Sequence, residues 1–146
     1  MASRRKHIPQ YVHDSYFSNI NLERLKGRVD EAAKNLRGLK FDAIAFTGMS
    51  GALLAPPLAV KLGKTLIMVR KRGTKSHSKL RVEGDQAAKT YIIVDDFQES
   101  GETARQIRAD VAKFAPHAKL LGIYEMHHQY RYETKSLQLT PVKEED

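Results

Sequence analysis

The chain has 146 residues, 41% hydrophobic and 29% charged, which is enough for one domain with a real core and too short for two. It contains no cysteine, which excludes a disulfide framework and a thiolate metal site and favours a reducing, cytoplasmic setting. The longest apolar run, residues 52–60, contains two prolines and is too short to span a bilayer, and the basic start of the chain precedes no apolar signal region. We therefore expect a soluble protein with a single domain, residues 1–146, in which residues 1–17 and 127–146 form peripheral segments and tails.

The formal net charge of +8 is concentrated in one part of the chain. Residues 61–82 contain no acidic side chain and eight basic ones, a number equal to the whole excess: Lys61, Lys64, Arg70, Lys71, Arg72, Lys75, Lys79 and Arg81. A local positive segment indicates a polyanionic ligand, and both a small phosphorylated molecule and a nucleic acid fit it.

The first half of the chain predicts a helix, a strand, a second helix and a second strand. Apolar residues recur at helical spacing over residues 22–36, and Gly38 stands where a C-terminal cap would lie. Residues 41–48 predict a strand that ends in a glycine turn. Residues 51–62 predict a helix that Pro56 and Pro57 would kink or divide, and residues 64–70 predict a buried strand.

The second half predicts an alternation of the same kind. Residues 70–85 have no apolar period and predict a long polar loop. Residues 90–96 predict a third strand, residues 103–114 a helix, residues 119–126 a fourth strand and residues 130–139 one or two peripheral strands. Strands separated by helices predict an α/β fold with a doubly wound, mainly parallel central sheet flanked by helices.

Three polar segments follow the carboxyl ends of predicted strands, which is where ligands bind in such folds. They are TGMSG at residues 47–51, RKRGTKSHS at residues 70–78 and DDFQESGET at residues 95–103. Since the carboxyl ends of parallel strands meet at one edge of a sheet, we expect the three segments to converge on one site.

The third of these segments combines an acid pair with a turn that leads into a helix. Backbone N–H groups and the helix dipole at such a turn suit a phosphate, and Gly101 allows the backbone to approach it closely. Asp95 and Asp96 suit hydroxyls or a divalent cation instead. A phosphate beside two hydroxyls describes a ribose phosphate. The structural alternative is that the acids cap a turn and that Ser100 caps the helix.

The stretch YIIVDDFQESGET, residues 91–103, resembles the 5-phosphoribosyl-1-diphosphate (PRPP) motif of the phosphoribosyltransferases in order, spacing and strand–loop–helix context. The resemblance implies the type I fold of that family, with a small hood built from the chain ends. It also implies transfer of a phosphoribosyl group from PRPP to a nucleobase with release of diphosphate, in nucleotide salvage or synthesis. In this family Asp95 and Asp96 would hold the ribose hydroxyls, and Mg²⁺ would accompany PRPP. The segment that binds PRPP through its 5-phosphate would be Gln98, Ser100, Gly101, Glu102 and Thr103.

The two other polar segments also resemble loops of this family. The loop that holds the diphosphate through backbone N–H groups matches Thr47, Gly48, Met49 and Ser50 by position, although a glycine turn between a strand and a helix is common in itself. The mobile catalytic loop of orotate phosphoribosyltransferases resembles residues 70–78, with one extra residue here. Its cationic members would be Arg70, Lys71, Lys75 and His77. A flexible cationic loop would stabilise the negative charge of departing diphosphate. The alternatives for this segment are a solvated basic loop and a nucleic-acid contact.

The identity of the base stays open at this point. Enzymes of the family that act on 6-oxopurines carry an acid at the position of Glu99, suited to a proton on a purine nitrogen, whereas orotate enzymes usually have a small residue there. The basic loop therefore favours orotate and Glu99 favours a purine. The resemblance also implies a homodimer. The alternative function is a regulator of the same fold that senses a nucleotide or binds RNA with little catalysis; a membrane partner is not expected.

Overall fold

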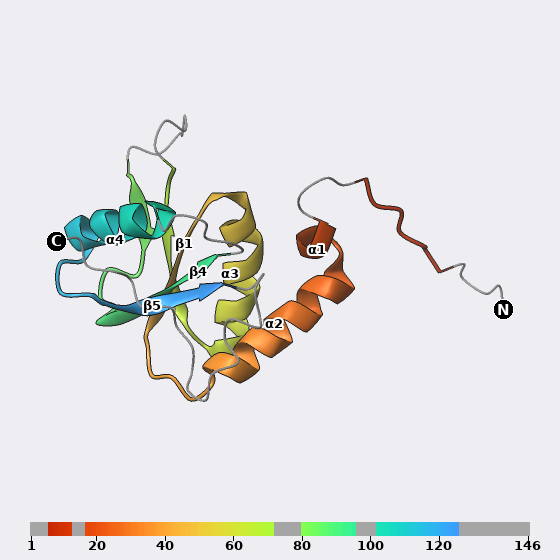
Figure 1. The fold of residues 1–146 in the computed structure, drawn as a ribbon, viewed down its shortest axis with the longest axis horizontal. Helices are drawn as coiled ribbons and strands as arrows, with labels where there is room; N and C mark the ends of the chain where they lie inside the picture. The colour runs from red at the N-terminus through yellow and green to blue at the C-terminus, as the bar shows by residue number, and fades with distance from the viewer. Residues whose placement is uncertain (1–5, 13–16, 72–79, 96–101, 126–146) are drawn as a thin grey trace.

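The computed structural model describes residues 6–12, 17–71, 80–95 and 102–125 (Figure 1). In chain order the elements are α1 Phe17–Ile20, α2 Leu22–Leu36, β1 Ala43–Thr47, α3 Gly48–Leu62, β2 Thr65–Val69, β3 Val82–Gly84, β4 Thr90–Asp95, α4 Glu102–Phe114 and β5 Lys119–Glu125. None of the helices in these ranges has both the length and the apolar character that crossing a membrane requires.

The five described strands form one sheet in the order β3-β2-β1-β4-β5. Strand β1 pairs in parallel with β2 and with β4, and β4 pairs in parallel with β5, whereas β3 is antiparallel to β2. The chain therefore runs from β1 outward to β2 and β3 and then returns to the other side of β1 for β4. The predicted α/β fold with a mainly parallel sheet is confirmed. The point where the strand order reverses lies between β1 and β4, and ligands of such sheets bind there, outside the carboxyl ends.

Alternate residues of the strands fill two separate cores, one on each face of the sheet. Ile44 and Phe46 of β1 belong to the core that includes residues of α2 and α3. Ala45 of β1 and Ile93 of β4 belong to the other core, together with Ile107 of α4. The sheet is thus covered by α2 and α3 on one face and by α4 on the other. This arrangement lets us assign any strand residue to a face from its position.

Helix α3 begins three residues earlier than predicted, so TGMSG is the end of β1 and the first turn of this helix. The helix runs undivided through Pro56 and Pro57, contrary to a prediction that allowed the prolines to divide it. It ends at Gly63, which has a φ of 67° and donates its backbone N–H to the carbonyl oxygens of Ala59 and Val60. A glycine in this left-handed conformation is a common end for a helix.

Helix α2 has the predicted bounds but a different C-terminal cap. Its N-cap is Asn21, whose side chain accepts a hydrogen bond of 3.2 Å from the backbone N–H of Arg24. The C-cap is Arg37 in a right-handed conformation, and Gly38 does not take a positive φ. The prediction that Gly38 forms the C-terminal cap of this helix is therefore wrong.

The predicted loop over residues 70–85 contains a strand that the sequence analysis missed. Strand β3 pairs residues 82–84 with residues 67–69 of β2. It has only three residues, one of them Glu83 and another Gly84, so it carries no apolar alternation that would distinguish it from a loop.

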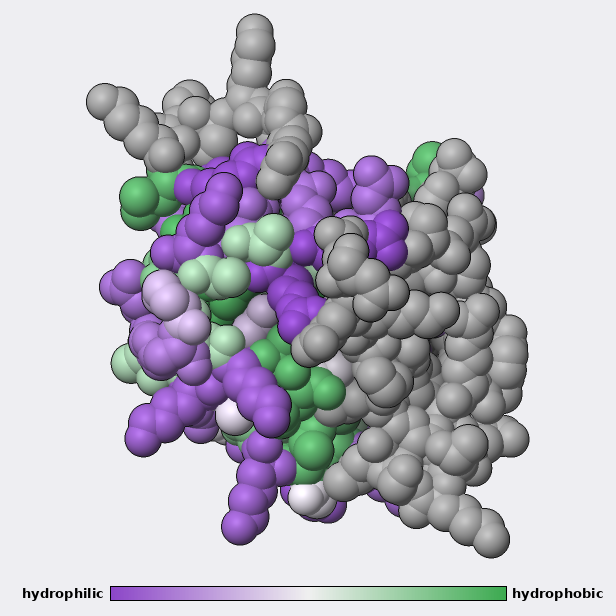
Figure 2. Space-filling model, turned by 60° about the vertical axis from the view of Figure 1, so that its left-hand side comes forward, coloured by the Kyte–Doolittle hydropathy of each residue, from purple (hydrophilic) through white to green (hydrophobic). Residues whose placement is uncertain are grey.

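Beyond these elements, the described residues 6–12 run away from the body of the molecule (Figure 1). The face drawn in Figure 2 is mainly hydrophilic where it is described, with an apolar area among the polar side chains. The predicted peripheral strands, and the part of the predicted hood that residues 127–146 would form, lie outside the described residues.

Candidate functional site

The first part of the candidate site is the end of β1, where Thr47 lies. Thr47 is 8% exposed, and its hydroxyl donates a hydrogen bond of 2.6 Å to the carbonyl oxygen of Val69 at the end of β2. The single hydroxyl proton of Thr47 is therefore used to hold two neighbouring strand ends together. At this position the backbone rather than the side chain is available to a ligand. Met49 is 65% exposed and Ser50 is half-buried in the same first turn of α3.

Gly48 opens α3 with a φ of 70°, a left-handed conformation that favours glycine. The side chain of Lys71 lies directly against it. A Cβ atom added to Gly48 would stand 2.7 Å from Cε and 3.1 Å from Nζ of Lys71. The first backbone N–H groups of a helix have no partner within the helix and carry the positive end of its dipole. The ammonium group of Lys71 thus adds a full positive charge beside a backbone that already suits an anion.

Arg70, one residue earlier, has a different environment. Its backbone N–H donates to the carbonyl oxygen of Arg81 at 2.9 Å, and its Nε donates to the carbonyl oxygen of Leu80 at 3.0 Å. Its guanidinium group also forms an ion pair with Glu83 of β3. The structure therefore places Arg70 at the base of the segment 72–79, tied to the antiparallel strand, while Lys71 lies over α3.

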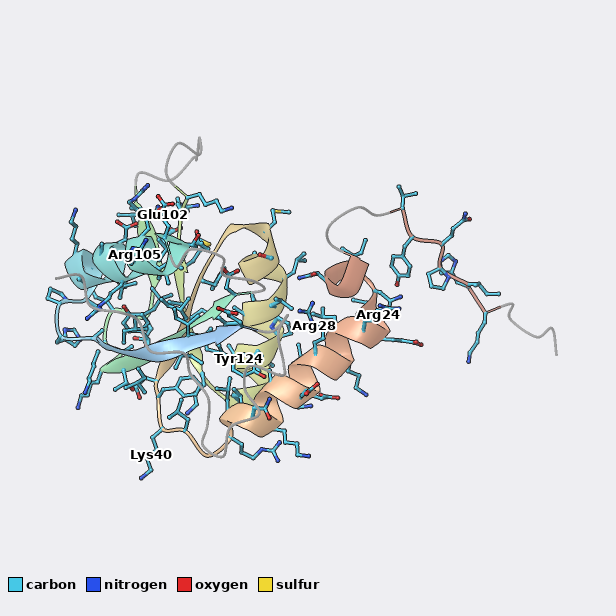
Figure 3. All side chains as sticks on the ribbon, viewed as in Figure 1. Arg24, Arg28, Lys40, Glu102, Arg105 and Tyr124 are labelled. Carbon is cyan, nitrogen blue, oxygen red and sulfur yellow. The ribbon has the colours of Figure 1, made fainter. Side chains whose placement is uncertain are left out.

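The second part of the candidate site is the end of β4, the strand beside β1. Asp95 is the last residue of β4 and is half-buried. It shares a face with Ile93, so its side chain lies on the side of the sheet that α4 covers. Helix α4 begins at Glu102, which is exposed, and continues with the half-buried Thr103 (Figure 3). The start of this helix and the end of β4 thus belong to the same face of the molecule.

Several predicted site residues lie outside the described residues, so their placement remains a prediction. These are Lys75, His77, Asp96, Gln98, Glu99, Ser100 and Gly101. Among the residues that are described, the structure brings together Thr47, Gly48 and Lys71 at the ends of β1 and β2, with Asp95 on the next strand.

One residue at this edge of the sheet was missed by the sequence analysis. Glu125 ends β5, stands opposite Asp95 in the parallel pairing of β4 with β5, and is only 2% exposed. The signal in the sequence was an acid at the end of an otherwise apolar strand. It was overlooked because no motif includes it.

Within the described ranges, no group of three or more His, Asp or Glu side chains converges to hold a metal ion. The carboxylates that the structure describes at the ends of β4 and β5 are Asp95 and Glu125.

The sheet order, the helix on each face and the position of the strand ends define the class of fold: this is the type I phosphoribosyltransferase fold. An adenine phosphoribosyltransferase from Thermoanaerobacter pseudethanolicus superimposes with a TM-score of 0.54 and 24% identity, over 70% of this chain and 67% of that chain. An orotate phosphoribosyltransferase from Mycobacterium tuberculosis superimposes with a TM-score of 0.61 and 13% identity, over 75% of this chain and 61% of that chain.

Sequence similarity points in the same direction. The chain is 30% identical to an adenine phosphoribosyltransferase from Fervidobacterium nodosum, over 64% of this chain and 64% of that protein. The chain therefore spans somewhat less than two thirds of the length of this relative. No protein-family model matches the chain.

Proposed function

We propose that this chain is a PRPP-dependent phosphoribosyltransferase, built as a single domain, that transfers the 5-phosphoribosyl group to a nucleobase and releases diphosphate. One observation carries the proposal: the ammonium-bearing end of Lys71 lies against Gly48 at the start of α3. This places a cation and the free N–H groups of a helix at the sheet position where ligands bind, one strand away from Asp95.

The end of β1 and the end of β2 would hold the diphosphate. Its oxygens would accept hydrogen bonds from the first backbone N–H groups of α3, and Lys71 would offset their charge. These interactions strengthen as the diphosphate leaves and its negative charge grows, so they favour the transition state over bound PRPP. By resemblance, Lys75 and His77 would approach the same group.

The end of β4 would hold the ribose. Asp95, and by resemblance Asp96, would accept hydrogen bonds from the ribose hydroxyls and favour the positive charge that develops on the sugar ring. The 5-phosphate would bind at the start of α4 through the segment that includes Gln98, Ser100 and Thr103.

The chemical step is a displacement at the anomeric carbon. A ring nitrogen of the base forms a bond to this carbon while the bond to the diphosphate oxygen breaks, and the diphosphate leaves with the electron pair. The base then loses the proton of that nitrogen to solvent or to the departing diphosphate. When bound, Mg²⁺ would neutralise part of the diphosphate charge, with Asp95 as the described residue placed to assist in holding it.

The nature of the base is a separate part of the proposal. Glu99 favours a 6-oxopurine and the basic segment favours orotate, while two of the relatives compared above are adenine phosphoribosyltransferases by name. We therefore include adenine with the 6-oxopurines and orotate as candidate substrates. By resemblance we also expect a homodimer and a cytoplasmic location; sedimentation velocity would test the first.

The direct test is a diphosphate-release assay with PRPP and Mg²⁺ against hypoxanthine, guanine, xanthine, adenine, orotate and uracil, with PRPP binding followed by calorimetry. We expect release with at least one base. PRPP binding without release would indicate a nucleotide-sensing or RNA-binding regulator instead, and a lack of PRPP binding would overturn the proposal.

A pair of lysine variants links the assay to the site. Lys71→Met removes the charge beside Gly48 and should weaken PRPP binding about 10- to 100-fold, the loss typical of a hydrogen bond to a charged group. The matched control is Lys64→Met at the opposite end of β2, where Lys64 lies 4.7 Å from the ring centroid of Phe41. PRPP binding should be unchanged in that control.

A further inference from the structure

Arg70 and Lys71 are adjacent at the end of β2, but their side chains have different surroundings. The side chain of Lys71 is exposed and lies against Gly48 at the start of α3. The side chain of Arg70 is 24% exposed and forms an ion pair with Glu83 of β3, whose side chain is 40% exposed. This contrast indicates different tasks for two neighbouring cations at the ligand-binding edge of the sheet.

The contacts of Arg70 are directed toward β3 and the residues just before it. Its Nε donates a hydrogen bond of 3.0 Å to the carbonyl oxygen of Leu80, and its Nη2 donates to the carboxylate of Glu83. Its backbone N–H donates to the carbonyl oxygen of Arg81 at 2.9 Å. Arginine binds a phosphate best through two parallel N–H groups, and here the neighbouring pair Nε and Nη2 is engaged within the chain. Arg70 is therefore poorly placed to bind PRPP.

The position of Lys71 depends on how Arg70 is held. The pairing of β2 with β1 and with β3 ends at Val69, and the contacts of Arg70 hold the chain directly after that point. Lys71 comes next, and its side chain reaches Gly48 from there. A change in the direction of the backbone at Arg70 would move the ammonium group of Lys71 away from the start of α3.

We infer that Arg70 is a positioning residue rather than a ligand of PRPP, and that Glu83 holds it so that Lys71 lies at the start of α3. This inference rests on the proposed function, in which Lys71 offsets the charge of the diphosphate. Without the carboxylate of Glu83, the guanidinium group turns toward solvent and releases the backbone that directs Lys71. A partly exposed ion pair adds little to global stability, so its loss should affect ligand binding more than folding.

The test compares the full-length natural chain with Glu83→Gln, which keeps the shape of the side chain and removes its charge. Calorimetry with PRPP and Mg²⁺ measures binding. Removing a negative charge near the site would by itself favour an anionic ligand, so weaker binding is the result that positioning predicts. We expect the dissociation constant of PRPP to rise about 3- to 10-fold in Glu83→Gln and by a similar factor in Arg70→Met. Because both changes remove the same contact, the double variant should stay within about twofold of the weaker single variant.

Coupling to Lys71 separates positioning from a general loss of structure. Lys71→Met should weaken PRPP binding about 10- to 100-fold in the natural chain, and this factor should be about 3- to 10-fold smaller in the Glu83→Gln background. The matched control is Asp30→Asn, which removes the acid of another partly exposed ion pair, the one between α2 and Lys61 on α3. In that control, PRPP binding and the effect of Lys71→Met should be unchanged. Urea denaturation checks that each variant is folded.

Three outcomes would count against the inference in different ways. If Glu83→Gln binds PRPP as tightly as the natural chain or more tightly, while Arg70→Met loses affinity, Arg70 contacts PRPP directly and the inference is wrong. If the effects of Glu83→Gln and Lys71→Met simply multiply, Glu83 does not act through Lys71, and the inference is wrong while the transferase proposal stands. If the natural chain does not bind PRPP at all, the proposed function itself is wrong, and the inference fails with it.

Discussion

Two features of the structure favour glycine at position 48. Its φ of 70° favours glycine, and Lys71 occupies the space that a Cβ would take. We predict that Gly48→Ala lowers the free energy of unfolding by about 1 to 2 kcal/mol, the cost of a left-handed conformation for other residues. It should also weaken PRPP binding about tenfold or more, because the new methyl group displaces the side chain of Lys71. Chemical denaturation and calorimetry measure the two effects.

Gly63 provides the matched control for this prediction. It has nearly the same φ, 67°, but a Cβ added there would meet no atom within 4 Å. Gly63→Ala should therefore lose a similar amount of stability and keep its affinity for PRPP. Equal PRPP affinity in the two variants would mean that the position of Lys71 over α3 does not matter for binding.

Tyr124 links β5 to α2 through a hydrogen bond with Asn35. Nδ2 of Asn35 on α2 donates to the hydroxyl oxygen of Tyr124 at 2.9 Å, and burial raises the pKa of this tyrosine. We predict that Tyr124→Phe lowers the free energy of unfolding by about 1 kcal/mol, because the partly buried amide loses its acceptor. Urea denaturation at pH 7 measures the loss. Tyr91→Phe, at a buried tyrosine with no hydroxyl hydrogen bond to another described residue, should show a smaller change.

At the scale of elements, two ion pairs join neighbouring segments in different surroundings. Arg81, just before β3, lies 3.3 Å from the carboxylate of Asp110 on α4, and Asp110 is 4% exposed. Lys61 on α3 pairs with Asp30 on α2 at the surface, and the hydrogen bond from Lys61 lowers the pKa of Asp30. The first pair includes a buried charge and the second does not.

We predict that Arg81→Met destabilises the protein by about 1 to 3 kcal/mol, because it leaves the charge of Asp110 buried without this partner. Lys61→Met should hardly move the denaturation midpoint, since water solvates both groups of an exposed pair. Urea midpoints of the two variants at pH 7 test the contrast. A similar loss in both would show that burial of Asp110 does not matter for the link between β3 and α4.

The elements themselves were largely predictable, because their apolar periods are clear. The strand over residues 119–125 and the helix over residues 22–36 were expected nearly as they are found. The ion pair of Arg70 with Glu83 was not predictable, because it depends on β3, and this strand has too few residues to show an apolar pattern. Nor could the sequence show that Lys71 crosses to Gly48, because that contact depends on the path of the lysine side chain from the end of β2 to the start of α3.

At the scale of the whole molecule, the strand order explains why distant segments share one site. Residues 47–51 and 95–103 are far apart in the chain, yet β1 and β4 are neighbours in the sheet. The sequence predicted that strand ends converge at one edge, but it did not predict which strands are adjacent. That adjacency places β5, and with it Glu125, on the other side of β4 from β1.

At alkaline pH, the ionisation of Tyr91 should lower the free energy of unfolding of the protein. Burial raises the pKa of Tyr91 to about 12 from an ordinary value of 10.0, an effect that Arg108 partly opposes. Above pH 10 the unfolded chain loses this proton while the folded chain keeps it, so unfolding becomes more favourable as the pH rises toward 12. At about 1.4 kcal/mol for each pH unit, we predict that Tyr91 lowers the free energy of unfolding by about 2 to 3 kcal/mol across this range.

The comparison that isolates this contribution is the natural chain against Tyr91→Phe, denatured in urea at pH 8, 10, 11 and 12. Lysine side chains also lose their protons in this range, but they do so in both proteins. The stability difference between the two should therefore change by about 2 to 3 kcal/mol, with the natural chain losing more. Parallel curves would mean that Tyr91 ionises as readily in the folded protein as in the unfolded chain, and that the core beneath β4 admits water at high pH.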